Sequence, residues 1–223
     1  NEWASSREME IIDELYDAVW VYGSRDVFDT TSEYGFLRRI ADKTRYLGYI
    51  PKYNGDLTHE EVRSRFSLDD RPLVVVTTGG GEDGFPLISL YLDMLEEGCG
   101  PAGCSSVIVT GPGMSSEHRK IIDARAAQQF CRVIEFTNHM TCLVSSAELV
   151  VTMGGYNTLT EALALGKRIV SVPRTAPRME QFIRARRFES LGLLTLVDLR
   201  SSTTGDLGEA VRFELNRPAD ARP

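Results

Sequence analysis

The sequence predicts an α/β protein built on a doubly wound parallel sheet. From Leu73 onward, short runs of apolar and β-branched residues alternate with segments whose apolar residues recur at helical spacing. Strands of a parallel sheet are buried on both faces, so they are continuously apolar. Two of the expected strands are followed by glycine turns, at 79–84 and 154–155, that lead directly into helices. Together these observations favour a sheet covered by helices on both sides.

The elements of this domain follow one another at short intervals. The expected strands are residues 73–78, 107–110, 132–135, 149–152 and 168–172. The expected helices are residues 85–97, 116–129, 139–146, 158–165 and 178–191, and Gly166 ends the fourth of them as a glycine often does. We assign residues 71–200 to this domain and residues 201–223 to a C-terminal helix, expected within 205–215, with a polar tail.

The first seventy residues are less regular. We expect a helix over 6–16, a strand over 18–22, a loop containing Asp26, Asp29 and Thr30, a helix near 33–42, a strand over 45–50 and a short helix over 59–66. These elements are too few to enclose a core alone. We interpret residues 1–70 as the end of a preceding domain with its linker, and the start at Asn1 suggests a part of a longer chain.

Composition narrows the classes of function. Of 223 residues, 42% are hydrophobic and 26% are charged, which is typical of globular proteins and not of disordered, collagenous or coiled-coil chains. The net charge of −7 disfavours a nucleic-acid partner. No segment approaches the roughly 18 consecutive apolar residues of a membrane helix, although peripheral contact with a membrane stays open. Four cysteines without a C-x-x-C pair suit a reducing compartment, so we expect a cytoplasmic location.

One pair of residues has the spacing of metal ligands. His139 and Cys142 are three apart on an expected short helix and could supply two zinc ligands. No second pair has matching spacing. We therefore expect a surface histidine and a core cysteine, and no metal site.

The first glycine turn has the pattern G-x-G-x-x-G, formed by Gly79, Gly81 and Gly84 between a strand and a helix. Two features argue against a pyridine dinucleotide. The next strand ends in Thr110–Gly111 rather than in an acid that would hold a ribose, and Glu82–Asp83 would repel a pyrophosphate. No lysine follows as in a P-loop. Two interpretations of this glycine turn stay open: it is a plain connection between a strand and a helix, or it lines a cleft.

The second glycine turn carries more information. Gly154 and Gly155 have no side chains that could cover the first amides of the next helix. An anion would bind to these exposed amides. Asn157 and Thr158 stand where N-cap side chains are expected, and Glu161 lies one turn further, where a carboxylate could accept two vicinal hydroxyls. Two interpretations stay open: a nucleotide site, or simple capping with Glu161 reaching back to the helix start.

A third loop, at 172–181, also enters a helix. It contributes Arg174 and Arg178 as phosphate candidates, and its Glu180–Gln181 pair suits sugar hydroxyls. Arg184, Arg186 and Arg187 follow on the helix and are expected on a solvated face without a functional role.

These motifs together resemble the donor-nucleotide site of GT-B glycosyltransferases. The run from Gly154 to Glu161 is followed some twenty residues later by Glu180–Gln181. This pattern is similar to the glycine–aromatic–Asn–Ser/Thr–x–x–Glu motif of UDP-sugar transferases. The order of motifs resembles family 28, which has a Gly-Gly-rich turn as at 79–81 and a Phe-x-x-x-Met segment as at 136–140. The resemblance covers about residues 71–200 and implies a Rossmann-like GT-B C-terminal domain preceded by a fragment of the N-terminal domain.

The resemblance implies a role for each matching residue. Glu161 would bind the ribose, and Phe136 and Thr137 would flank the base. The diphosphate would be held by Gly154, Gly155, Asn157 and Thr158 with the turn at Gly80 and Gly81, and the donor sugar by Glu180 and Gln181. The chain departs from the family pattern in two places. Met153 stands where the motif of related transferases often has histidine, and Glu82–Asp83 stand where related loops have serine and glutamine.

The implied activity is transfer of a hexosyl group from a UDP-sugar to an unknown acceptor. No Asp-x-Asp occurs in the chain, so we expect metal-independent transfer, with no cofactor besides the donor. The family places the acceptor site and the general base on the N-terminal domain, which this chain mostly lacks. No catalytic residue is assigned here, and we expect the fragment alone to be inactive. The alternatives are a UDP-sugar 2-epimerase and a non-catalytic nucleotide-sugar-binding subunit.

Overall fold

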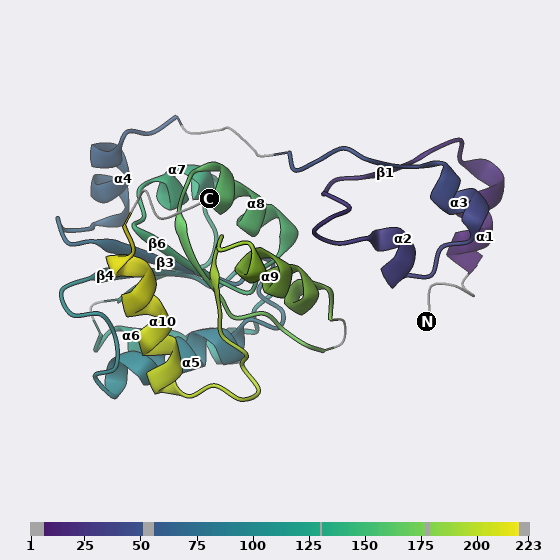
Figure 1. Cartoon of the computed structure of the whole chain (residues 1–223). Helices are drawn as coiled ribbons and strands as arrows, with labels where there is room; N and C mark the ends of the chain where they lie inside the picture. Colours follow the sequence, from purple (N-terminus) through teal and green to yellow (C-terminus); the bar gives the residue numbers. More distant parts are fainter. Residues whose placement is uncertain (1–6, 51–55, 130, 177–178, 219–223) are drawn as a thin grey trace. The chain divides into compact units, whose positions relative to one another are not determined.

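The computed structural model describes residues 7–50, 56–129, 131–176 and 179–218 (Figure 1). The chain divides into two compact units, Asn1–Ile50 and Pro51–Pro223. The division follows Ile50, whereas the sequence suggested a boundary at residue 70. The difference arises because Val62 and Phe66 of α4 (His59–Phe66) are buried, and α4 packs against α7 (Met140–Ser145) within the larger unit.

The larger unit contains a six-stranded sheet in the order β5-β4-β3-β6-β7-β8. The strands are β3 (Leu73–Thr77), β4 (Ser105–Val109), β5 (Cys131–Ile134), β6 (Leu149–Thr152), β7 (Arg168–Ser171) and β8 (Thr195–Leu196), and all neighbouring pairs are parallel. Every residue of β3, β4 and β6 is buried, which confirms the expected doubly wound sheet. The two-residue strand β8 was too short to be predicted.

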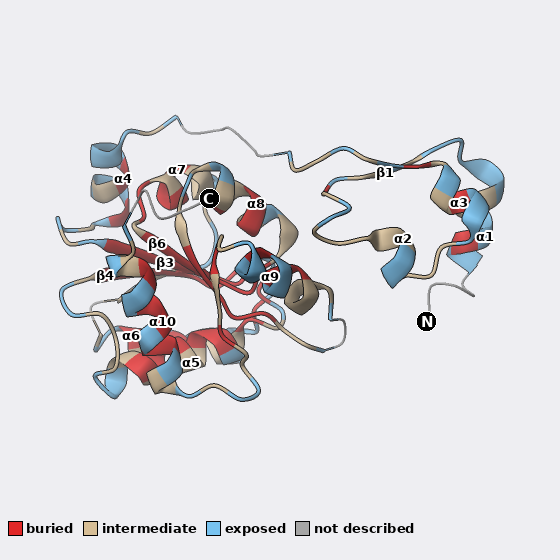
Figure 2. Ribbon diagram, viewed as in Figure 1, coloured by how far each residue is buried: buried red, intermediate tan, exposed pale blue. Residues whose placement is uncertain are grey.

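Helices cover both faces of this sheet. They include α5 (Phe85–Glu96), α6 (Ser116–Ala126), α8 (Tyr156–Ala164), α9 (Glu180–Ser190) and α10 (Thr204–Asn216). Helices α5, α6 and α10 gather on one side of the sheet, and α7 and α8 on the other (Figure 1). Buried residues concentrate in the strands and on the inner sides of these helices (Figure 2). None of the described helices combines the length and apolar character of a bilayer-spanning segment.

The sheet has one position where the direction of winding reverses. Strands β3 and β6 are neighbours, with Thr77 paired to Thr152, but the chain passes from β3 to β4 on one side and from β6 to β7 on the other. The loops that leave β3 and β6 therefore diverge. Such a reversal opens a crevice at the carboxyl ends of the strands, where open α/β sheets bind their ligands.

The smaller unit has a two-stranded parallel sheet. Its elements are α1 (Arg7–Leu15), β1 (Val19–Val21), α2 (Thr30–Glu33), α3 (Arg38–Asp42) and β2 (Thr44–Tyr46). Strand β2 ends at Tyr46, earlier than expected. The single helix expected near 33–42 is instead two helices, because Asp29 starts α2 early and Gly35, with a φ of 64°, interrupts the chain before α3.

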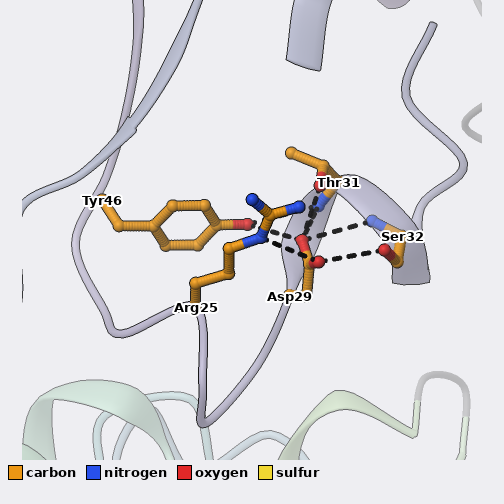
Figure 3. A network of polar contacts seen from close by, with 5 residues as sticks. All are labelled: Arg25, Asp29, Thr31, Ser32 and Tyr46. Carbon is orange, nitrogen blue, oxygen red and sulfur yellow. Dashed lines mark hydrogen bonds and ion pairs between the residues drawn. The ribbon is translucent and has the colours of Figure 1, made fainter. Parts of the chain in front are cut away.

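The side chain of Asp29 is the centre of a polar network in this unit (Figure 3). It accepts hydrogen bonds from the Thr31 amide at 3.1 Å, from Tyr46 Oη at 2.9 Å and from Ser32 Oγ at 3.0 Å, and it forms an ion pair with Arg25 at 3.0 Å. Desolvation acts to raise the pKa of Asp29, but the hydrogen bonds from Thr31, Arg25, Tyr46 and Ser32 outweigh it and hold the pKa well below its usual range. Asp29 therefore joins α2 to β2 as a charged group.

Candidate functional site

A cavity of about 320 Å³ opens at the carboxyl ends of β3 and β6. It is lined by Thr78, Gly79, Gly80, Gly81, Glu82, Asp83, Gly155, Tyr156, Asn157, Thr158, Arg174 and Gln181. Seven of these residues were predicted site residues: Gly80, Gly81, Gly155, Asn157, Thr158, Arg174 and Gln181. The cavity thus lies at the reversal point of the sheet and collects all three loops that the sequence singled out.

The turn after β3 forms one wall of the cavity. Gly81 has a φ of 95°, and a Cβ there would lie 2.3 Å from the carbonyl oxygen of Thr110. The amide of Gly113 donates a hydrogen bond of 2.7 Å to the carbonyl of Gly80. Only glycine fits this close approach of two loops, and the result is a wall made of backbone.

The N-terminus of α8 forms the facing wall. The N-cap is Gly155, which has no side chain to cap the helix. Asn157 and Thr158 are the second and third residues of α8, so the alternative in which they cap the helix is wrong. The first turn instead lines the cavity, where a helix N-terminus favours an anion.

Gly154 allows this arrangement. Its φ is 79°, and a Cβ at this position would lie 2.8 Å from Ser171 Oγ on β7. A side chain would therefore meet both backbone strain and a collision. Met153, the departure from the family pattern, is buried in the core with 4% exposure, so position 153 does not contribute to the cavity.

Arg174 connects two walls of the cavity. Its Nη1 forms an ion pair with Asp83 of the first loop, and its amide donates a hydrogen bond of 3.4 Å to Gln181 Oε1. The Arg174 Nε is buried and has no hydrogen-bond partner within the described residues. The negative charge of Asp83, which the sequence suggested would repel a phosphate, is thus offset by a neighbouring guanidinium.

The remaining residues of the third loop have other surroundings. Arg178 lies outside the described residues. Glu180 is not in the cavity lining and forms an ion pair with Arg184 one turn along α9.

Arg184 was expected on a solvated face, and this prediction is wrong. Its side chain is buried, with 6% exposure, and donates a hydrogen bond of 3.4 Å to the carbonyl of Gly154. The spacing of Glu180 and Arg184, four residues apart on a helix, was the signal that could have identified the pair.

The predicted nucleoside residues form a second group beside α7. Glu161 is half-buried, lies outside the cavity lining and accepts a hydrogen bond from Thr141 Oγ1. Phe136 is 64% exposed. Thr137 Oγ1 accepts a hydrogen bond of 3.1 Å from the amide of His139. Glu161 therefore reaches from α8 toward the segment that carries the other two residues, and it does not cap its own helix.

Thr141 was missed by the sequence analysis. A threonine within an apolar helix carries no distinguishing signal, and only the packing of α7 against α8 brings its hydroxyl to Glu161.

Residues 74–222 match the family model described as the glycosyltransferase family 28 C-terminal domain. The chain belongs to this family. The resemblance drawn from the motifs is thereby confirmed, and the sheet described above is its Rossmann-like GT-B C-terminal domain.

Two curated relatives extend the comparison. An uncharacterized glycosyltransferase of Methanopyrus kandleri is 26% identical over 201 residues, which cover 89% of this chain and 53% of the relative. A UDP-N-acetylglucosamine–N-acetylmuramyl-(pentapeptide) pyrophosphoryl-undecaprenol N-acetylglucosamine transferase of Alkaliphilus oremlandii is 27% identical over 120 residues, 53% of this chain and 32% of the relative. The chain thus spans about half of the length of the first relative and about a third of the second.

Solved structures agree on the fold. The glycosyltransferase of kitacinnamycin superposes with a TM-score of 0.63 at 15% identity, covering 91% of this chain and 47% of the other. The glycosyltransferase VinC in complex with DTDP gives a TM-score of 0.56 at 17% identity, covering 79% and 44%. At sequence identities of 15% and 17%, the structural similarity supports the fold alone.

Proposed function

We propose that this chain is the donor-binding part of a glycosyltransferase that transfers a hexosyl group from a UDP-sugar. The observation that carries the proposal is the cavity at the sheet reversal, where the backbone of the glycine turn faces the uncapped N-terminus of α8. Amide groups in this arrangement suit a diphosphate, and Arg174 adds a positive charge at the same wall. The relative from Alkaliphilus oremlandii is named for a UDP-sugar donor, which supports the same choice of nucleotide.

The nucleoside would extend from this cavity toward α7. Glu161 would accept the ribose hydroxyls, with Phe136 and Thr137 beside the base. When the ribose binds in this pose, the carboxylate of Glu161 either gives up its hydrogen bond from Thr141 or accepts the ribose hydroxyls in addition to it. Gln181 lies in the cavity wall and is the better placed of the two proposed sugar contacts, because Glu180 is paired with Arg184.

Departure of UDP would develop negative charge on the diphosphate. The α8 amides and Arg174 are positioned to stabilise that charge by electrostatic preorganisation. A general base for the acceptor hydroxyl would come from the N-terminal domain, as would the acceptor site. We therefore propose that residues 1–223 bind donor without supporting rapid transfer.

Calorimetric titration of the chain with UDP, UDP-glucose, UDP-N-acetylglucosamine and dTDP tests the donor class. We expect saturable binding of UDP and of at least one UDP-sugar, with weaker binding of dTDP. Binding of none of these nucleotides would refute the proposal. A preference for dTDP would retain the site and change the donor. Product analysis of the full-length protein with UDP-N-acetylglucosamine separates transfer from 2-epimerisation and from simple binding.

We also propose a cytoplasmic location. None of the four cysteines forms a disulfide, and burial raises the pKa of the Cys131 thiol to about 11 even though a hydrogen bond with Ser106 acts to lower it. Thiols that are not joined in disulfides suit a reducing compartment. Fractionation of cells that produce the full-length protein tests this location, and recovery with membranes would show peripheral attachment instead.

A further inference from the structure

Three side chains with metal-binding atoms meet at the start of α7, away from the cavity. They are the carboxylate of Asp56, the imidazole of His139 and the thiol of Cys142. One ligand atom from each lies within 4.8 Å of the others. None of the three lines the cavity at the sheet reversal, and none is among the residues proposed to bind the donor. The cluster adjoins the proposed nucleoside group, because Thr137 and Thr141 are close neighbours of His139 in the chain.

Two of the three distances between ligand atoms match those of a tetrahedral zinc site. Asp56 Oδ1 lies 3.3 Å from His139 Nδ1 and 3.6 Å from Cys142 Sγ. Zinc bonds of about 2.0 Å to nitrogen or oxygen and about 2.3 Å to sulfur, at tetrahedral angles, separate neighbouring ligand atoms by about 3.3 to 3.5 Å. The third distance, between the ligand atoms of His139 and Cys142, is at most 4.8 Å, so a zinc ion fits between the three atoms after a small adjustment of these two side chains.

The surrounding backbone holds the ligands in place. His139 is the N-cap of α7 and Cys142 is its third residue, so both are fixed by the same helical turn. Asp56 stands two residues before Thr58, the N-cap of α4, where a capping box fixes the helix start. Because α4 packs against α7, the carboxylate is held next to the other two ligands by tertiary structure.

The three ligand side chains differ in their exposure to solvent. Cys142 is 2% exposed, the His139 side chain 21% and the Asp56 side chain 73%. The thiolate and the imidazole would therefore bind an ion from the protein side, while the carboxylate closes the site from the solvent side. Three protein ligands leave a fourth tetrahedral position for water. A thiolate with an imidazole selects zinc over magnesium or calcium.

We propose that Asp56, His139 and Cys142 bind one zinc ion, which fastens the segment before α4 to α7. This proposal replaces the expectation, drawn from the sequence, that His139 and Cys142 serve no metal. It assigns the ion no part in transfer. Binding of the ion would displace the thiol proton of Cys142.

Cobalt titration of the chain, purified with chelator, tests the proposal spectroscopically. We expect one equivalent of Co²⁺ to produce a thiolate-to-cobalt charge-transfer band that an equivalent of Zn²⁺ removes. The Cys142→Ser variant should lose the band, whereas Cys131→Ser should keep it. Absence of the band from the wild-type chain, or its survival in Cys142→Ser, would overturn the proposal.

A second variant covers the case in which Cys142→Ser fails to fold. Asp56 is exposed, so Asp56→Asn should fold normally, and we expect it to weaken Zn²⁺ binding at least tenfold in a competition titration against a chromogenic chelator. Asp70→Asn, an exposed acid beyond α4, is the matched control and should bind as the wild type does. Equal Zn²⁺ affinity in the two variants would remove Asp56 from the site and refute the three-ligand proposal.

Discussion

Thr141 on α7 donates a hydrogen bond to Glu161 on α8, so the carboxylate proposed to bind the ribose is already oriented by a neighbouring helix. The two residues are twenty positions apart and meet because α7 packs against α8. A carboxylate held in one position loses less conformational freedom when it receives a ligand hydroxyl. We infer that Thr141 is a positioning residue for Glu161.

The first prediction concerns this pair. We expect Glu161→Ala to weaken UDP binding by about 1–3 kcal/mol, because the ribose hydroxyls lose their acceptor on leaving water. Thr141→Val should have a smaller effect in the same direction. Calorimetry with UDP measures both. The control is Glu209→Ala on the exposed side of α10, and an affinity for UDP that is the same in all three variants would contradict the ribose assignment.

The second prediction concerns the ion pair of Arg174 and Asp83. Asp83 places a negative charge beside the proposed diphosphate and engages the guanidinium. We expect Asp83→Asn to tighten UDP binding by about 0.5–1 kcal/mol, since the pair is partly exposed and its energy is modest. Arg174→Gln should weaken UDP binding about tenfold, because a charge-assisted contact is lost.

Uridine provides the internal control for these two variants. It has no phosphate, so its affinity should be the same in the wild type, Asp83→Asn and Arg174→Gln. If uridine and UDP respond alike, Arg174 supports the fold of the cavity and is not a phosphate ligand.

Much of the fold was predictable because parallel strands are continuously apolar. The five strands expected after Leu73 are all present, and α5, α6 and α9 start within two residues of their expected positions. Helix α8 starts at Tyr156, two residues early, because Gly155 and not a polar side chain is its N-cap. Glycine turns that precede helices were visible in the sequence, so the cavity walls were predictable as well.

Contacts between distant segments were not predictable in this way. The ion pair of Arg174 with Asp83 joins residues 91 positions apart, and Asp56 meets His139 over a separation of 83. The prediction of a solvated face on α9 failed at Arg184 for the same reason, since its guanidinium is buried and donates a hydrogen bond to Gly154 of another loop. Local patterns identify turns and helix starts, whereas partners across the sheet depend on packing.

The third prediction compares two adjacent glycines. Gly154→Ala should lower the free energy of unfolding by about 1–2 kcal/mol from backbone strain alone, with a further loss from the collision with Ser171 Oγ. Gly155 has a φ of −57°, and a Cβ there meets nothing within 4 Å. Gly155→Ala should therefore cost less, about 0.5–1 kcal/mol, because alanine is a poorer N-cap residue than glycine. Urea denaturation measures both, and equal losses would show that position 154 has no special conformational requirement.

The fourth prediction concerns acid and the network around Asp29. Because the pKa of Asp29 is lowered in the folded chain, its contribution to stability is fully present above its ordinary pKa of 3.8 and is lost as the pH falls through the lower folded value. Protection of the Thr31 and Ser32 amides from hydrogen exchange should therefore decline below about pH 4. Asp29→Asn keeps a capping oxygen but has no charge to lose, so its protection should be lower at pH 7 and vary less with acid. Asp17→Asn, an exposed acid before β1, should follow the wild type, and an acid response in Asp29→Asn as steep as that of the wild type would place the titrating group elsewhere.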